Sequence, residues 1–269
     1  MKLTVLVDNY TFIDEYYWGE PGVCFYIEDG DEKLLFDLGY SDLFIRNAEK
    51  MKIDLSKVRK IILSHGHDDH TGGLPHFMKN FDPSETQLIA HPGALMKKVY
   101  ENMSIGSPAS QDSLEGLCKV TLSKRPVEIS EKLIFLGEIP MLCEFEKRIA
   151  IGKTLSSDGW KDDYVYDDSS LVYRGEEGLY IITGCAHSGI CNTIEYAKKV
   201  CGDERIAGVI GGFHLLEMNE RVEKTIAYFK KNGISSLYPC HCVSLFVKGE
   251  MLRQLPVKEV GVGLTLEWK

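Results

Sequence analysis

Hydrophobic and polar positions alternate through the first third of the chain in a way that predicts a β-meander. The expected strands are residues 3–7, 23–28 and 33–37. Asp29-Gly30-Asp31 predicts a tight turn between the last two strands. Apolar residues then recur at helical spacing after Ser41, a residue suited to cap a helix that runs to about Met51. A short apolar strand at 61–63 ends abruptly in the polar segment Ser64–Gly73.

The rest of the chain predicts alternating strands and helices. We expect helices at 74–79, from Gly93, at 190–201, at 221–232 and from about Val243; the expected strands are 87–91, 127–129, 133–136, 171–173, 179–183, 206–210 and 236–238. Residues 102–117 carry Ser, Gly and Pro and predict a surface loop that covers a site. The alternation favours an α/β fold, an αββα sandwich of two mixed sheets with helices on the outer faces, in one domain spanning 1–269.

Composition narrows the class of protein. The formal net charge is −9, which argues against nonspecific binding to nucleic acid or to an anionic membrane. No apolar run approaches the roughly 20 residues that span a bilayer. The first residues indicate a strand rather than a secretory signal, and the 8 cysteines lack the spacing of a disulfide framework. These features predict a cytoplasmic protein with all its thiols reduced.

The polar segment after residue 63 carries the strongest chemical signal. His65, His67, Asp69 and His70 fall within six residues, directly after a buried strand. In an extended loop, residues i and i+2 project to the same side, so His65 and His67 can grip one cation. Neutral imidazole and carboxylate suit Zn²⁺, Mn²⁺ or Fe²⁺. A solvated polar loop is the alternative, but the chain has only 8 histidines, so this clustering favours a metal site.

The spacing His65-x-His67-x-Asp69-His70 resembles the first metal motif of the metallo-β-lactamase superfamily. Leu34–Gly39 resembles the strand that precedes the motif there. The resemblance implies the αββα sandwich, with metals held by loops at one edge of the two sheets. The motif is specific for the superfamily but not for the substrate, because hydrolases of amides, thioesters, lactones and phosphoesters share it.

Three later segments each place a histidine directly after an expected strand. They are Thr183–Gly189, Gly211–Leu215 and Pro239–Cys242, which contain His187, His214 and His241. Loops at strand ends are where such folds build sites. Together the segments resemble the branch that includes the archaeal dihydropterin-ribofuranosylaminobenzene phosphate synthase.

One position departs from the superfamily pattern. Members commonly carry a metal-bridging Asp after the strand equivalent to 179–183, whereas this chain has Cys185. Either Cys185 supplies a thiolate or His187 takes the ligand role. We favour His187, because a free cysteine more often packs as a small apolar residue. No histidine lies in the usual place of the third motif, so Asp167 or Asp168 is a further candidate, and the site holds one or two ions.

These observations predict a metal-dependent hydrolase with a small-molecule substrate, a phosphoester being somewhat favoured. The expected metal ligands are His65, His67, Asp69, His70, His187 and His241. They would hold one or two divalent transition-metal ions, Zn²⁺ first and Mn²⁺ or Fe²⁺ as alternatives. Asp69 is also expected to orient the metal-activated water, and His214 to donate a proton or contact the substrate.

Three alternatives stay open. The narrower resemblance implies metal-assisted transfer of a pterin-methyl group from its diphosphate to an aminobenzene ribose phosphate. Iron-based redox chemistry uses similar ligands. A non-enzymatic metal-binding module is the third, although structural zinc sites are usually rich in cysteine and the main cluster contains none. Cys240 and Cys242, on either side of His241, are interpreted as partly buried thiols beside the site rather than as ligands.

Overall fold

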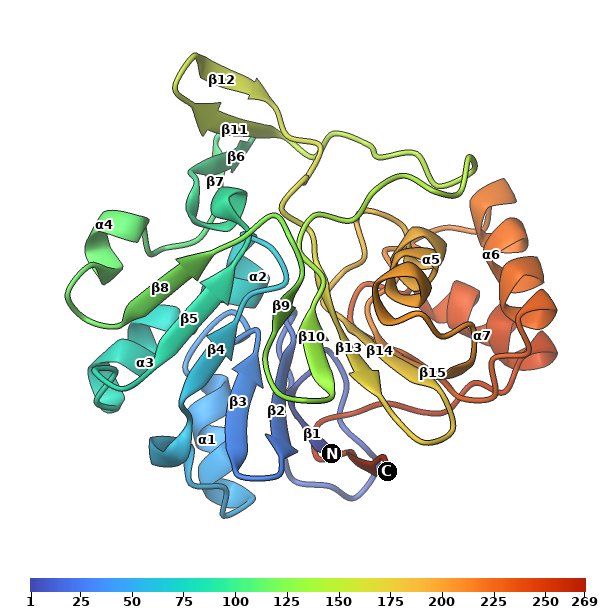
Figure 1. Cartoon of the computed structure of the whole chain (residues 1–269), viewed down its shortest axis with the longest axis horizontal. Helices are drawn as coiled ribbons and strands as arrows, with labels where there is room; N and C mark the ends of the chain where they lie inside the picture. Colours follow the sequence, from blue (N-terminus) through green and yellow to red (C-terminus); the bar gives the residue numbers. More distant parts are fainter.

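Two β-sheets pack face to face, with helices on both outer faces, in the computed structural model of the chain, which describes residues 1–269 (Figure 1). This is the αββα sandwich that the sequence predicted. Both termini lie at the same end of the sandwich (Figure 1). β17, at the end of the chain, pairs antiparallel with β1 at its beginning.

The first sheet has seven strands and contains the predicted meander. Its order is β17 (Thr265–Glu267), β1 (Lys2–Val7), β2 (Cys24–Asp29), β3 (Glu32–Phe36), β4 (Lys60–Ile62), β5 (Gln87–Ala90) and β8 (Lys119–Leu122). Strands β3, β4, β5 and β8 are parallel neighbours. Helices α1 (Leu43–Lys50) and α3 (Leu74–Asn80) link them and contribute Phe44 and Phe77 to the cluster on the outer face of this sheet.

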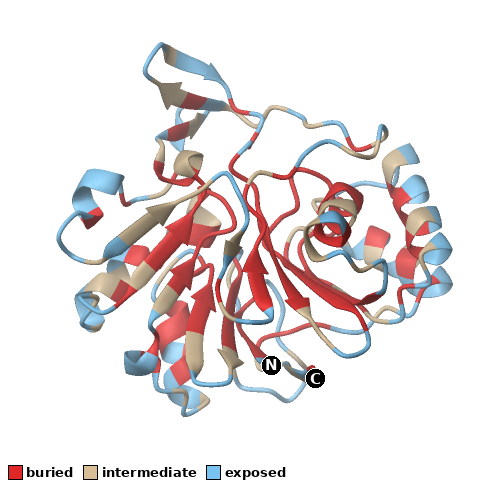
Figure 2. Ribbon diagram, in the orientation of Figure 1, coloured by how far each residue is buried: buried red, intermediate tan, exposed pale blue.

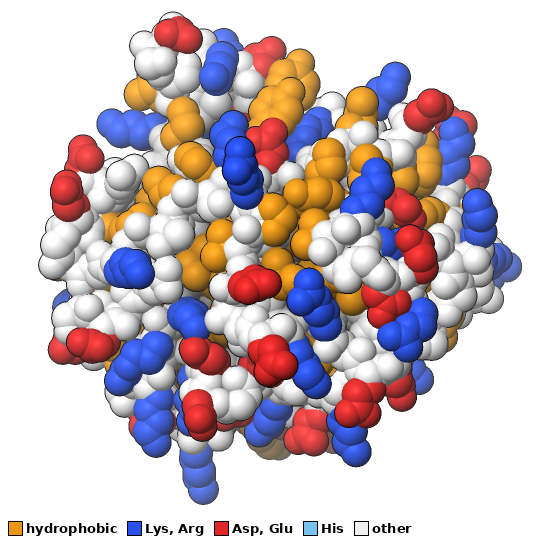
Figure 3. Space-filling model, in the orientation of Figure 1, with side chains coloured by type: hydrophobic (Ala, Val, Ile, Leu, Met, Phe, Trp, Pro, Cys, Tyr) orange, Lys and Arg blue, Asp and Glu red, His pale blue; other side chains and the backbone are white.

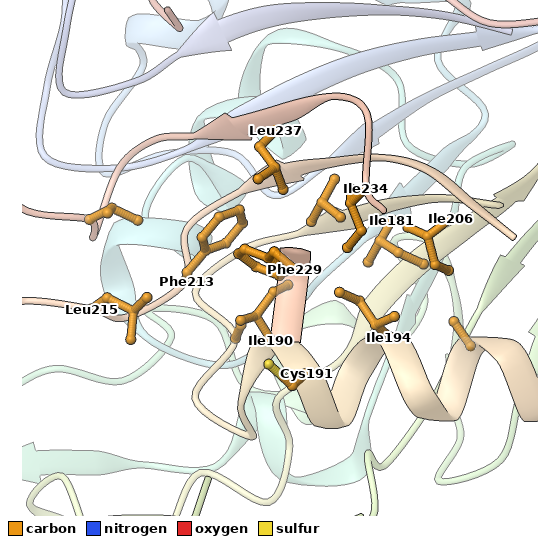
Figure 4. Close-up of a cluster of buried hydrophobic side chains, with 14 of the residues drawn as sticks. Ile181, Ile190, Cys191, Ile194, Ile206, Phe213, Leu215, Phe229, Ile234 and Leu237 are labelled. Carbon is orange, nitrogen blue, oxygen red and sulfur yellow. The ribbon is translucent and has the colours of Figure 1, made fainter. Parts of the chain in front are cut away.

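The second sheet has six strands. Its order is β16 (Leu237–Pro239), β15 (Ile206–Gly211), β14 (Leu179–Thr183), β13 (Ser170–Arg174), β10 (Leu133–Phe135) and β9 (Val127–Glu128). Helices α5 (Ile190–Cys201), α6 (Glu220–Lys231) and α7 (Leu245–Gln254) cover its outer face. Figure 4 shows α5 directing Ile190 and Ile194 toward Ile181 of β14, with Phe213 and Phe229 packed beside them. The apolar stripe of each helix is buried against its sheet, which is what stabilises such short helices.

The central core lies between the two sheets. Phe25 and Phe36 from the first sheet meet Phe135 and Ile182 from the second in one buried cluster. Figure 2 shows this buried layer running through the middle of the molecule, with exposure concentrated on the outer helices and connecting loops. The sheets therefore form a rigid scaffold whose loops at one edge can be held in place.

A third, four-stranded sheet projects from the sandwich and was not predicted. We call it the arm sheet; it consists of β12 (Gly159–Asp162), β11 (Lys153–Ser156), β6 (Lys98–Tyr100) and β7 (Met103–Ser104) (Figure 1). The helix expected from Gly93 is wrong. A single 3₁₀ turn, Pro92–Leu95, leads instead into β6, whose backbone pairs with β11 more than 50 residues further along the chain. That long-range pairing overrides the local helical pattern.

The loop expected at 102–117 is also more structured than predicted. It contains β7 and a short helix, α4 (Gln111–Leu114), and Ile105 reaches the edge of the sandwich, where its carbonyl accepts a hydrogen bond from the Asp68 N–H at 3.0 Å. On the face drawn in Figure 3, lysine and arginine side chains are interspersed with aspartate and glutamate around a central apolar region. No helix combines the length and the apolar character needed to cross a bilayer.

Candidate metal centre

All the histidines predicted to act in the site meet at one edge of the sandwich. The loops that carry them follow β4 in the first sheet and β14, β15 and β16 in the second. Because β14, β15 and β16 are parallel, their carboxyl ends lie at the same edge, and the loop after β4 faces them across the sandwich. The structure therefore brings together His65, His67, Asp69, His70, His187, His214 and His241.

Three imidazoles form one half of this cluster, which we call the three-histidine group. The ring of His65 lies 4.6 Å from the ring of His67 and 4.7 Å from that of His187, and the rings of His67 and His187 are 5.0 Å apart. The Nε2 atoms of His67 and His187 are buried and have no hydrogen-bond partner. Buried polar atoms are rarely left unpaired, so these nitrogens are suited to bind a cation.

A mixed set of donors, which we call the acidic group, forms the other half. It contains Asp69, His70, Cys185 and His241, whose ligand atoms all lie within 4.8 Å of one another. Asp69 Oδ2 is 3.2 Å from His241 Nε2 and 3.6 Å from His70 Nε2. The sequence had not separated the ligands into these two groups.

Cys185 stands between the two groups. Its Sγ is 3.2 Å from His70 Nε2 in the acidic group, and it also lies within 4.8 Å of the ligand nitrogens of His65 and His187. This position makes Cys185 a candidate ligand, the alternative that the sequence left open, although the residue is also buried. Cys185 and His187 are two residues apart on one loop, and both side chains reach the cluster, so the geometry is compatible with either one or both as ligands.

Two buried carboxylates and an amide form hydrogen bonds with two of the candidate ligands, His70 and His241. Asp37 Oδ2 accepts hydrogen bonds from His70 Nδ1 and Ser64 Oγ, each at 2.7 Å. Asn9 Oδ1 is 2.9 Å from His241 Nδ1, and Asp8 Oδ1 accepts the His241 N–H at 2.9 Å. Such partners set which ring nitrogen faces a metal. The sequence analysis did not identify Asp8, Asn9 or Asp37 as functional residues. The signal that could have found them is their position as polar residues directly after the apolar strands β1 and β3.

Asp167 and Asp168 are supports and belong to neither group. Asp167 Oδ2 accepts the N–H of Gly66 at 2.8 Å, and its other oxygen is 2.8 Å from the buried ammonium of Lys98. Asp168 Oδ2 accepts the N–H of Ser188 at 2.9 Å and so anchors the loop of His187. A side chain at Gly66 would meet the carbonyl oxygen of Ala94 at 2.2 Å, so only glycine fits this close approach.

The two groups differ electrostatically. Burial together with the neighbouring imidazoles lowers the pKa of His65 and His187, and burial and the charge of Lys98 lower the pKa of His67 to about 4. Burial disfavours the charged form of His70 too, but the carboxylates of Asp69 and Asp37 outweigh it and raise the pKa of His70 to about 9. The three-histidine group is thus neutral at pH 7, the form in which imidazole binds metal.

The cluster opens into a cavity of about 540 Å³. Tyr10 and Tyr40 line its wall together with Ile105 and Leu216, and no lysine or arginine lines it. Tyr10 belongs to a segment rich in aromatic residues, Tyr10–Trp18. Trp18 from the same segment is cover instead, since the Arg46 guanidinium lies 4.7 Å from its ring.

His214 and Cys242 lie on the cavity side of the cluster. The ring of His214 is 4.3 Å from the ring of His187, and its Nδ1 is buried without a partner. Cys242 Sγ accepts the backbone N–H of His214 at 3.3 Å, whereas Cys240 is buried in the core between the sheets. His91 lies outside the cluster: it caps the turn at 92–95, and its Nε2 is 3.2 Å from Glu138.

The donor set fits a divalent transition metal. Imidazole nitrogens, one carboxylate and one thiol are the ligand types of zinc and related ions, and the unpaired ring nitrogens face the same space. The same edge of the fold carries all of these donors. Residues 17–199 match the metallo-β-lactamase superfamily. The chain belongs to this superfamily.

Relatives cover almost the whole chain. The 7,8-dihydropterin-6-methyl-4-(β-D-ribofuranosyl)-aminobenzene-5′-phosphate synthase of Methanocaldococcus jannaschii is 33% identical over 257 residues, which are 90% of this chain and 87% of that protein. A second protein of that organism, MJ0448, is 32% identical over 89% of this chain and 90% of its own length. The crystal structure of Tm1679, a metal-dependent hydrolase of the β-lactamase superfamily, aligns with a TM-score of 0.85 at 28% identity, covering 99% of this chain and 98% of that one.

Membership of the metallo-β-lactamase superfamily supports the interpretation of the cluster as a metal site. Its fold implies divalent metal binding at this edge of the sandwich, and the predicted motif residues lie there. The position where the resemblance led us to expect a departure, Cys185 after β14, lies between the two groups.

Proposed function

We propose that the chain is a metal-dependent hydrolase that acts on small phosphoesters. The observation that carries this proposal is the meeting of the three-histidine group and the acidic group around Cys185 at the floor of an open cavity. Structural zinc sites are closed, whereas catalytic sites keep an open position. The proposed ligands are His65, His67 and His187 for one ion and Asp69, His70, Cys185 and His241 for a second.

The ligand types favour Zn²⁺, with Mn²⁺ or Fe²⁺ as alternatives. When bound, the metal supplies Lewis acidity, which lowers the pKa of water from about 15.7 toward about 7 and polarises a substrate oxygen. The chain supplies the orientation. Asp69 Oδ2 lies beside His241 and faces the cavity, so its carboxylate can accept a hydrogen bond from the attacking water.

His214 is proposed to protonate the leaving group or to contact the substrate. Its ring lines the cavity next to His187, outside both ligand groups that hold the proposed ions. The backbone of His214 adopts a φ of 48°, an uncommon conformation for a residue other than glycine, and its N–H is tied to Cys242. The loop therefore holds this imidazole at the cavity wall.

The cavity lining favours a substrate with little charge beyond the reacting phosphate. No lysine or arginine lines the cavity, so the negative charge of a phosphoester depends on the metal and on hydrogen bonds from neighbouring side chains. Asn9, His214 and Ser244 lie in the lining and can supply such bonds. A phosphomonoester or diester fits this environment better than a triphosphate.

Transfer of a pterin-methyl group is the second candidate. The observation that favours it is the 33% identity over 90% of the chain to the archaeal synthase. Tyr10 and Tyr40 in the cavity wall offer flat faces against which a planar heterocycle can stack. In that reaction a diphosphate leaves and an aminobenzene ribose phosphate is the acceptor.

Anaerobic purification with metal analysis, followed by turnover assays, tests the proposal. Phosphomonoesters, phosphodiesters, lactones and thioesters would be tried alone, and a pterin-methyl diphosphate with its acceptor in parallel. Turnover of a phosphoester, absent from a His65→Ala/His67→Ala double variant, supports hydrolysis. Activity only with the diphosphate and the acceptor together would instead establish transfer, and no activity with any class would contradict both enzymatic proposals.

A further inference from the structure

The thiols of Cys185 and Cys242 form a close pair that the proposed hydrolysis does not use. Their Sγ atoms lie within 4.8 Å of each other, with a ring nitrogen of His214 at the same range. Cys242 Sγ is also 3.7 Å from the carbonyl oxygen of Cys185, so the side chain of Cys242 is directed at the Cys185 loop. A disulfide needs the sulfurs to approach to about 2.05 Å, so the two side chains must turn further toward each other to form the bond.

The local backbone holds the two cysteine loops close together. Gly212 lies between them: a Cβ there would sit 2.5 Å from Cys242 Sγ and 3.3 Å from Cys185 Cα. The N–H of Gly212 donates to the carbonyl of Gly184 at 2.9 Å, and the N–H of Cys240 donates to Gly211 at 2.9 Å. These backbone hydrogen bonds join the loops after β14, β15 and β16 into one unit, so the pair does not depend on a flexible segment.

The pair is open to small molecules on one side. Cys242 is half-buried, and both thiols line the cavity, whereas Cys191 and Cys240 are fully buried in hydrophobic cores. Figure 4 shows Cys191 packed among Ile190 and its neighbours. The rate at which a cysteine is oxidised depends on its solvent access as well as on its thiolate character. Peroxide that enters the cavity can therefore reach Cys185 and Cys242 more readily than Cys191 and Cys240.

We infer that Cys185 and Cys242 are a redox modification site, joined as a disulfide by hydrogen peroxide, and that this bond withdraws a ligand from the metal centre. Cys242 attacks one peroxide oxygen, giving a sulfenic acid and hydroxide. Cys185 then attacks that sulfur and displaces the second oxygen as hydroxide. With the two thiol protons, the products are one disulfide and two waters.

The effect on the metal rests on the proposed function, because it requires Cys185 to be a ligand. A disulfide sulfur is a poor ligand compared with a thiolate. Since Cys185 lies within reach of both the three-histidine group and the acidic group, its loss weakens the hold on either ion. Oxidation then releases metal and stops turnover, and a dithiol reductant with added Zn²⁺ restores both.

The first experiment measures the cross-link in the native protein, independently of activity. Holoprotein and chelator-treated protein are exposed to hydrogen peroxide, quenched with catalase and denatured. Intact mass and thiol titration are measured directly, and a separate portion is alkylated for peptide mass mapping. We expect loss of two thiols, a mass decrease of about 2 Da, and one linked pair of peptides containing Cys185 and Cys242. Bound Zn²⁺ should slow the reaction by about tenfold or more, because it occupies the Cys185 thiolate.

Matched variants identify the pair. Cys242→Ser should abolish the cross-link yet retain metal under peroxide, and Cys118→Ser, which removes a half-buried thiol outside the cavity, should behave as the parent protein. Irreversible oxidation of a single cysteine, or a different linked pair, would overturn the proposed site. A cross-link that forms equally fast with and without Zn²⁺ and releases no metal would overturn its link to the metal, while turnover of a phosphoester would still stand on its own assay.

Discussion

The carboxylate of Asp37 lies 2.7 Å from Nδ1 of His70, and both side chains are completely buried. This contact leaves the other ring nitrogen of His70 to face Asp69 and Cys185. The same carboxylate accepts the N–H of Ser64 at 2.7 Å, one residue before the first proposed ligand. Asp37 therefore orients the metal-binding loop and one imidazole together, from the end of a strand in the first sheet.

Replacing Asp37 with Asn should weaken metal binding by about 10–100-fold, the usual effect of losing an outer partner of a histidine ligand. The amide keeps the shape of the side chain but removes its charge. Competition with a chromophoric chelator measures the affinity. Asp31→Asn, at an exposed turn after β2, is the control and should bind metal as the parent does. Equal affinity in Asp37→Asn would show that Asp37 only supports the backbone.

The His65→Ala/His67→Ala double variant should lose at least one equivalent of bound metal, because both imidazoles belong to the three-histidine group. Elemental analysis after gel filtration gives the stoichiometry. The circular dichroism spectrum should persist, since the cores between and outside the sheets lie away from the loop. His76→Ala on α3 serves as the matched control. Full metal content in the double variant would contradict the proposed centre.

Cobalt reports directly on the role of Cys185. The Co²⁺-substituted protein should show a thiolate-to-metal charge-transfer absorption in the near ultraviolet, since the Cys185 sulfur lies among the ligands of the acidic group. Cys185→Ser should remove this absorption, whereas Cys242→Ser should retain it. If the band instead disappears only in Cys242→Ser, the thiol ligand is the other cysteine.

His214→Ala should retain its metal and lose about 10²–10⁴-fold in kcat, the usual contribution of a positioned proton donor. The prediction follows from the position of His214 in the cavity lining, outside the two proposed ligand groups. Steady-state kinetics on an activated and an unactivated ester separates the roles. A proton donor matters less when the leaving group is a good one, so an equal loss on both substrates points to substrate binding. Loss of metal would make His214 a ligand.

Lys98→Met should destabilise the fold by about 3–5 kcal/mol, because it leaves two buried carboxylates without their counter-charge. Lys98 is 1% exposed, and its Nζ lies 2.7 Å from Asp163 and 2.8 Å from Asp167. Denaturant unfolding measures the free energy. Lys161→Met, on the exposed strand β12 of the same arm sheet, should change it little. A change below about 1 kcal/mol in Lys98→Met would show that the ion pairs of Lys98 with Asp163 and Asp167 contribute little to the stability of the fold.

Local sequence determined the elements whose signals lie within the element itself. Helix α5 has the bounds that its pattern predicts, 190–201, because Gly189 and Gly202 flank an apolar stripe that packs on one sheet. The histidine motif was equally readable, since its spacing and the preceding strand are both local. Short strands such as β8 and β17 were missed because partners distant in the chain stabilise them.

Tertiary structure alone decided which donors share a site. Cys185 has the sequence context of a small packed residue, and only the meeting of β4 with β14 across the sandwich puts its sulfur beside His70. Asp37 and Asp167 likewise became supports through contacts with residues 33 and 101 positions away. Sequence periodicity reports which side of an element a residue occupies. It does not report which loops come together at a sheet edge, because strand order and sheet packing set those distances.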